Sequence, residues 1–133
     1  MYLLDTNICI YAINHRSESV IQKVKSYLPH QIKVSSVTVA ELEYGASKSK
    51  YREQNRIANL NFLSAFDIVA FDDEDAEEYG VIRAELEKNG QVIGPYDMQI
   101  AAQAISKDLI LVTNNVKEFD RIKGLKIENW VKD

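Results

Sequence analysis

Short apolar runs alternate with helical patterns along the whole chain, and this alternation restricts the fold more than any other feature. Strands are indicated at Tyr2–Leu4, at Ile32–Ser35 and at residues 67–71 and 109–112, with a possible edge strand at 125–128. Strand–helix alternation is typical of a mainly parallel sheet with helices on both faces. We therefore expect an α/β fold of three layers around a central sheet of four to five strands.

Helical patterns occupy the segments between these runs. The expected helices span Thr6–Ile13, residues 18–28, 38–48 and 52–66, Asp73–Lys88, and residues 95–107 and 116–121. The periodicity places Leu28 on the packed face of the second helix, and Ile57 and Leu60 on that of the fourth. Pro29 is expected to end the second helix, because proline cannot continue one.

The composition fits one compact domain over residues 1–133. Hydrophobic residues make up 46% of the chain, but no apolar run approaches the roughly 20 residues of a membrane-spanning helix. The single cysteine, Cys9, forms no internal disulfide, so we expect a cytoplasmic protein that does not enter a membrane. The net charge of −4 argues against nonspecific nucleic-acid binding through the whole surface, although it permits a local basic groove.

Carboxylates follow the expected strands, at the edge where parallel sheets bind ligands. Asp5 directly follows the first strand, Glu41 follows the second, and Asp97 lies in the first turn of a helix; Asn115 and Glu118 follow the fourth strand. Clustered carboxylates resist ionisation unless a cation compensates their charge. Hard oxygen ligands select Mg²⁺ or Mn²⁺, which can support in-line attack of water on a phosphodiester.

Each acid also has a structural explanation. Asp5 could cap the helix that follows it. The spacing of Thr38 and Glu41 matches a capping box. Asp97 would favour the dipole of its helix in any protein. Only the joint position of the acids at one sheet edge speaks for a site.

Four segments together resemble a PIN-domain ribonuclease of the VapC toxin type: LLDTN, SSVTVAELEYG, GPYDMQIAA and LVTNNVKEFDRI, in that order and spacing. The resemblance covers essentially the whole chain. It implies a PIN-like fold and a metal-dependent endoribonuclease with catalytic acids Asp5, Glu41 and Asp97, of which Asp5 and Asp97 hold Mg²⁺ or Mn²⁺. It further implies a VapB-type antitoxin that blocks the site, a homodimer, and inhibition of translation by cleavage of tRNA, with the initiator tRNA anticodon loop as the favoured target.

The fourth acid of the family pattern is missing here. Many relatives carry an aspartate where Asn115 stands, and a neutral amide contributes no charge. The fourth metal-site residue is therefore Asn115, Glu118 or Asp120, and the number of ions, one or two, stays open. The spacing of Asn115 and Glu118 equally matches a helix start. We favour a site of three acids that Asn115 supports.

Neighbouring polar residues have two interpretations each. Asn7 either orients Asp5 or starts a helix, and Thr113 either contacts an acid or phosphate or caps the last short helix. Tyr96 could stack on a base, but a partly buried tyrosine is the commoner case. The densest basic patch either contacts the RNA backbone or is surface charge: Lys48, Lys50, Arg52 and Arg56. The apolar residues between Leu42 and Phe66 are expected to form a groove for an antitoxin segment.

Two other functions fit parts of the pattern. A noncatalytic RNA-binding or adaptor domain with the same fold would bind RNA without cutting it. An aspartyl-phosphate phosphatase would use Asp5 as its nucleophile. Phosphatases that resemble haloacid dehalogenases need a second acid two residues later, and Asn7 occupies that position.

Overall fold

Five parallel strands form one sheet at the centre of the molecule. A computed structural model describes all 133 residues and orders the strands β3-β2-β1-β4-β5. Their bounds are β1 (Tyr2–Leu4), β2 (Ile32–Ser35), β3 (Asp67–Val69), β4 (Ile110–Val112) and β5 (Ile127–Glu128). All neighbouring strands run parallel, and β1 pairs with β2 on one side and β4 on the other. The predicted α/β fold with a parallel sheet is confirmed.

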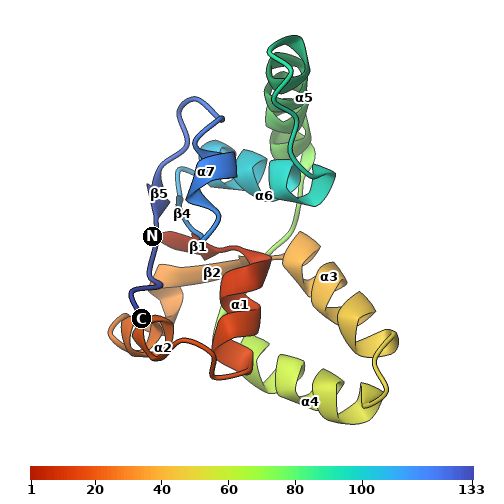
Figure 1. Cartoon of the computed structure of the whole chain (residues 1–133), viewed down its shortest axis with the longest axis vertical. Coiled ribbons are helices and arrows are strands. Elements are labelled where there is room, and N and C mark those ends of the chain that lie inside the picture. The colour runs from red at the N-terminus through yellow and green to blue at the C-terminus, as the bar shows by residue number, and fades with distance from the viewer.

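Seven α-helices and one short 3₁₀ helix connect the strands. They are α1 (Thr6–Ile13), α2 (Glu18–Lys25), the 3₁₀ helix η1 (Pro29–Gln31), α3 (Ser36–Ser47), α4 (Arg52–Leu63), α5 (Asp73–Lys88), α6 (Pro95–Ser106) and α7 (Val116–Phe119). In Figure 1, α5, α6 and α7 lie above the sheet, whereas α1, α2 and α4 lie below it. Helix α3 extends from the edge at which β2 ends, and α5 projects away from the body of the molecule. None of the helices has the length and apolar character needed to cross a membrane.

The core has two halves, one on each face of the sheet. Leu3 and Leu111 pack with residues of α5, α6 and α7. Leu4 and Val112, their neighbours along the same strands, pack with residues of α1, α2, α3 and α4. Because successive strand residues point to opposite faces, a short apolar run serves both halves. This alternation produces the three layers that the sequence predicts.

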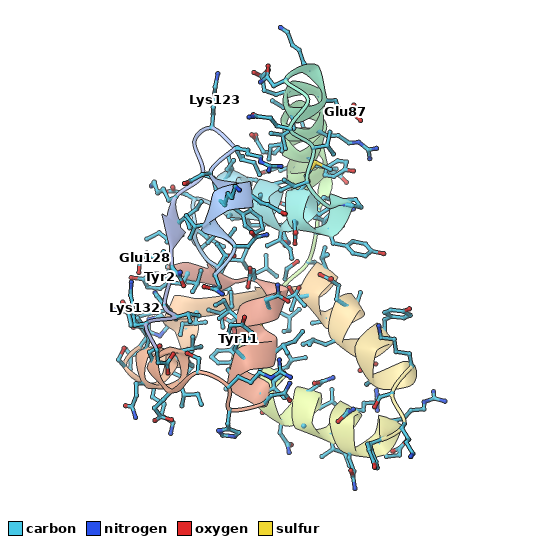
Figure 2. All side chains as sticks on the ribbon, viewed as in Figure 1. Tyr2, Tyr11, Glu87, Lys123, Glu128 and Lys132 are labelled. Atoms are coloured by element: carbon cyan, nitrogen blue, oxygen red, sulfur yellow. The ribbon has the colours of Figure 1, made fainter.

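An aromatic cluster packs at the start of β1, on the face of the sheet that α1 and α2 cover. The Tyr2 ring lies 4.8 Å from the Tyr27 ring and 5.1 Å from the Trp130 ring, between centroids. A hydrogen bond with the Tyr27 hydroxyl and burial raise the pKa of Tyr2 to about 12. Figure 2 places Tyr2 beside Glu128 on this side, away from α3. The shifted tyrosine is therefore part of the structural frame at the edge opposite the predicted site.

The helices predicted for α2, α4 and α7 are too long, the last by two residues. Helix α2 ends at Lys25, and Leu28 is extended and exposed, because a residue before proline is excluded from the helical region. Helix α4 ends at Leu63, and its buried residues are Asn59 and Leu63 rather than Ile57 and Leu60, which are exposed. A polar residue thus replaces part of the packed stripe, and periodicity of apolar residues alone misses it.

The alternative explanation of Glu41 as part of a capping box of α3 does not hold. Ser35 caps this helix and accepts a hydrogen bond from the Val37 amide, so that α3 begins two residues earlier than predicted. Thr38 and Glu41 then lie inside the helix, where neither caps its start. Glu41 is free for a different partner, which belongs to the candidate site.

Candidate active site

Asp5 connects the end of β1 to the start of α1. Its amide donates to the Val112 carbonyl at 3.0 Å, which continues the pairing of β1 with β4. Its side chain caps α1, since Oδ1 accepts a hydrogen bond from the Ile8 amide at 2.8 Å. The residue is nevertheless only 3% exposed. The capping role suggested by the sequence is real, but a surface serine would fill it without burying a charge.

Burial raises the pKa of Asp5 to about 6. Hydrogen bonding to Thr113 and to the Ile8 amide lowers this pKa, while the negative charges of Asp97 and Glu41 raise it. The Coulombic effects mean that side chains separated by long stretches of sequence face one another at one edge of the sheet. These acids thus lie at one edge of the sheet, without three of them converging on one ion.

Asp97 lies in the first turn of α6, after Gly94 and Pro95. Burial, followed by the charges of Glu41 and Glu118, raises the pKa of Asp97 to about 6. An acid at a helix start normally has its charged form stabilised by the helix dipole. The opposite shift shows that the surrounding carboxylates and the loss of water outweigh that dipole.

Glu41 is oriented by Thr6, whose hydroxyl also contacts that of Thr38. The Thr6 hydroxyl donates to Glu41 Oε1 at 2.8 Å and lies 3.0 Å from the Thr38 hydroxyl. This link joins the first turn of α1 to α3. This role of Thr6 was not predicted, although its position directly after Asp5 in LLDTN was the available signal.

Asn115 and Glu118 interact with each other. Asn115 Nδ2 donates to Glu118 Oε2 at 3.0 Å, and the Asn115 amide donates to the Thr113 hydroxyl at 2.9 Å. Asp120 is exposed and ends α7. Of the two candidate acids, Glu118 is thus the one whose charge acts on Asp97. Asn115 supports Glu118 by a hydrogen bond.

No positive charge compensates these carboxylates. Every ion pair in the molecule involves other acids, so Asp5, Glu41, Asp97 and Glu118 have no lysine or arginine partner. The structure also contains no group of three acidic, histidine or cysteine side chains arranged to hold one ion. The expected convergence of three acids on a shared ion is therefore not present in this arrangement, in which Glu41 is engaged by Thr6.

The remaining predicted residues lie near the site or beyond it. Asn7 is exposed at the start of α1, and its side chain makes no hydrogen bond to Asp5. The basic patch is exposed around the connection from α3 to α4, and Arg56 pairs with Glu43 at 3.4 Å. Of this patch, Lys48 borders a cleft that reaches Glu41.

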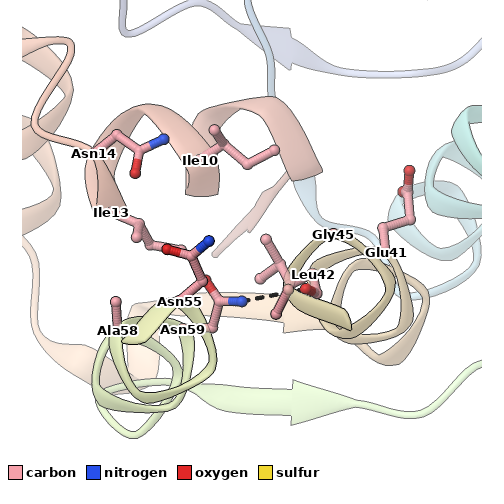
Figure 3. Close-up of a pocket in the computed structure, with 10 residues that line it drawn as sticks. Ile10, Ile13, Asn14, Glu41, Leu42, Gly45, Asn55, Ala58 and Asn59 are labelled. Carbon is pink, nitrogen blue, oxygen red and sulfur yellow. Dashed lines mark hydrogen bonds between the residues drawn. The ribbon is translucent and has the colours of Figure 1, made fainter. Parts of the chain in front are cut away.

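A groove of about 210 Å³ runs between α1, α3 and α4. Its lining mixes apolar and amide side chains, including Ile10, Leu42 and Asn55. In Figure 3, Glu41 lies at the end of the groove nearest α6, and Asn59 Nδ2 donates to the Leu42 carbonyl at 3.2 Å. The groove is therefore partly apolar along its length and has the Glu41 carboxylate at one end.

Residues 2–125 of the chain match the family model of the PIN domain. The chain belongs to the PIN-domain family. It is 46% identical over 133 residues to the Ribonuclease VapC2 of Rickettsia felis, which covers 99% of both chains. It is 43% identical over 129 residues to the tRNA(fMet)-specific endonuclease VapC of Shigella flexneri, which covers 97% of both.

A solved PIN-domain structure has the same fold. The crystal structure of VapBC2 from Rickettsia felis, bound to a DNA fragment from its promoter, superimposes with a TM-score of 0.92. That comparison covers 97% of this chain and 98% of the other, at 45% sequence identity. The resemblance to VapC-type PIN domains, drawn from four short segments, is thereby confirmed.

Proposed function

We propose that this PIN domain is a divalent-metal-dependent endoribonuclease toxin that cleaves tRNA and so inhibits translation. The observation that carries the proposal is the uncompensated pair of buried Asp5 and half-buried Asp97, whose pKa values are both raised to about 6 by burial and by neighbouring carboxylates. An arrangement of like charges without a cationic partner is expected where a cation binds. The relatives named as VapC ribonucleases support the nuclease assignment.

The donor set fits a hard divalent cation. Mg²⁺ commonly binds through one or two carboxylates and keeps several waters, so Asp5 and Asp97 suffice without a third protein ligand. When bound, the ion would lower the pKa of water and stabilise the charge on the phosphoryl oxygens. Mn²⁺ suits the same oxygen ligands.

The other residues have distinct tasks in this proposal. Glu41 uses Oε1 to accept the Thr6 hydroxyl, which leaves Oε2 to accept a proton from the attacking water. The water oxygen forms a bond to phosphorus while the opposite phosphorus–oxygen bond breaks, and the leaving oxygen takes a proton from solvent. Thr113 keeps Asp5 in place, and Asn115 does the same for Glu118.

An antitoxin is proposed to occupy the groove of Figure 3. Its lining is partly apolar, and Glu41 stands at its end, so a bound peptide with a basic residue there would cover the acids. The solved relative from Rickettsia felis is a VapBC complex, which supports a partner of this kind. The homodimer implied by the resemblance stays a prediction.

Cleavage of total tRNA with Mn²⁺, with and without EDTA, tests the activity. We expect cleavage only without EDTA, and a loss of at least about 100-fold in Asp5→Asn and Asp97→Asn, because each removes a proposed ligand. Glu43→Gln, on the same helix as Glu41 but outside the cluster, is the control and should cut normally. Cleavage in EDTA, or normal cleavage by both aspartate variants, would contradict the proposal.

A further inference from the structure

A second cleft shares Ile10, Glu41 and Gly45 with the groove of Figure 3. It has a volume of about 550 Å³, within the range of small-molecule sites. Three helices supply its walls. The residues that matter are Thr6 and Asn7 of α1, Glu41 and Tyr44 of α3, Lys48 directly after α3, and Tyr96 of α6.

Two tyrosines border this cleft from different helices. Tyr44 is 66% exposed and Tyr96 is 56% exposed, and neither belongs to a core cluster. Large aromatic side chains normally bury most of their surface when they serve the fold. The expectation of a partly buried Tyr96 is therefore wrong, and its exposed ring needs a different explanation.

The sequence spacing explains why the tyrosines accompany the acids. Tyr44 lies three residues after Glu41 on the same face of α3, and Lys48, which caps the C-terminal end of that helix, lies four residues after Tyr44. Tyr96 directly precedes Asp97 in the first turn of α6. Each tyrosine thus lies on the same helix as one carboxylate of the candidate site, Tyr44 with Glu41 and Tyr96 with Asp97.

The cleft combines aromatic surface with one positive charge. The Lys48 amine lies 4.8 Å from the centroid of the Tyr44 ring, within cation–π range. No carboxylate pairs with this amine. Exposed aromatic rings beside an unpaired cation are the two components with which proteins hold single-stranded nucleic acid.

We propose that Tyr44 and Tyr96 stack on an unpaired base of the RNA substrate, and that Lys48 contacts a phosphate of the same strand. The inference rests on the proposed ribonuclease function and names the residues that position a nucleotide beside the cut. A base held in this cleft is splayed out of its helix, as in a single-stranded loop. The phosphodiester that is cut is adjacent to the stacked nucleotide, because Glu41 lines both the cleft and the acidic site.

Binding without catalysis tests the stacking directly. A single-stranded RNA that carries 2-aminopurine is titrated in EDTA, where stacking quenches the fluorescence. We expect quenching with the unaltered chain and with Tyr44→Phe and Tyr96→Phe, which keep the rings. Tyr44→Ala and Tyr96→Ala should each weaken binding about tenfold, the scale of one lost base–aromatic contact. Tyr51→Ala is the control, because Tyr51 is equally exposed but lies outside the cleft.

Cleavage kinetics add a second readout. The alanine variants should raise KM and leave kcat near that of the unaltered chain, because stacking acts on binding. Lys48→Gln should reduce the salt dependence of binding by about one counterion, because it removes one phosphate contact.

Unchanged affinity in both alanine variants, or no quenching with the unaltered chain, would overturn the inference. So would alanine variants that lose antitoxin capture while their RNA affinity stays normal, because the cleft would then serve the protein partner. RNA that is bound with quenching but never cut would instead contradict the nuclease proposal.

Discussion

Asp5 shows how one side chain can serve the fold and the site together. Its oxygen caps α1, yet its charge is buried among other acids. Asp5→Asn keeps an oxygen for the Ile8 amide and removes the charge. Without divalent ions at pH 7.5, we expect the free energy of unfolding of this variant to exceed that of the unaltered chain by up to about 3 kcal/mol. The reason is that folding raises the pKa of Asp5 to about 6, which disfavours its charged form at this pH. Urea titration measures the difference; a less stable variant would contradict the assignment.

The pH dependence follows from the same shift. The pKa of Asp5 is about 6 in the folded chain and about 3.9 in the unfolded one, so the folded chain binds more protons between these values. Stability without metal should therefore fall as the pH rises from about 4 to 6. In Asp5→Asn this fall should be smaller, with Asp97 responsible for what remains, whereas the exposed Glu77→Gln should leave it unchanged. Melting temperatures across this range provide the comparison.

Thr6 is expected to act through Glu41. Thr6→Val removes the hydroxyl that orients Oε1 but preserves the shape of the side chain. We expect kcat to fall about tenfold with little change in KM, because a misplaced catalytic group affects the chemical step. Thr6→Ser should restore kcat, which a purely structural role would not predict. A normal kcat in Thr6→Val would show that Glu41 needs no such support.

At the scale of helices, Asn59 connects α4 to α3. Its buried amide donates to the Leu42 carbonyl beneath the groove. Asn59→Ala should lower the free energy of unfolding by about 1–2 kcal/mol, since a buried hydrogen bond and its packing are lost. It should also weaken antitoxin binding. Asn61→Ala, on the exposed side of α4, is the matched control, and an equal loss in both variants would exclude a special role for Asn59.

The order and type of the elements could be predicted from the sequence, because strand runs and helical periodicity are local signals. Asp73–Lys88 was even predicted with its observed bounds. The end of α2 at Lys25 and the start of α3 at Ser36 were not, since α2 stops before Pro29 requires it to and since Ser35, not Thr38, caps α3. The clustering of Asp5 and Asp97 followed from topology, but the bond from Thr6 to Glu41 joins two helices and has no local signature.

For the whole molecule, the two halves of the core are inseparable because adjacent residues of β1 belong to different halves. Leu3 packs on one side of the sheet and Leu4 on the other. We therefore expect the predicted single domain, residues 1–133, to unfold in one cooperative transition. Calorimetry should give equal calorimetric and van't Hoff enthalpies. Two separate transitions would contradict the single domain.

Titration with Mn²⁺, followed by water-proton relaxation, tests most directly whether Asp5 and Asp97 bind a divalent ion together. We predict Mn²⁺ binding at pH 7.5 that weakens at pH 5, because Asp5 and Asp97, each with a pKa of about 6, take up protons there. Asp5→Asn and Asp97→Asn should each lose at least about tenfold in affinity, while Glu77→Gln keeps the affinity of the unaltered chain. Equal Mn²⁺ affinity in all four proteins, or affinity that does not change with pH, would contradict the binding of a divalent ion by Asp5 and Asp97 together.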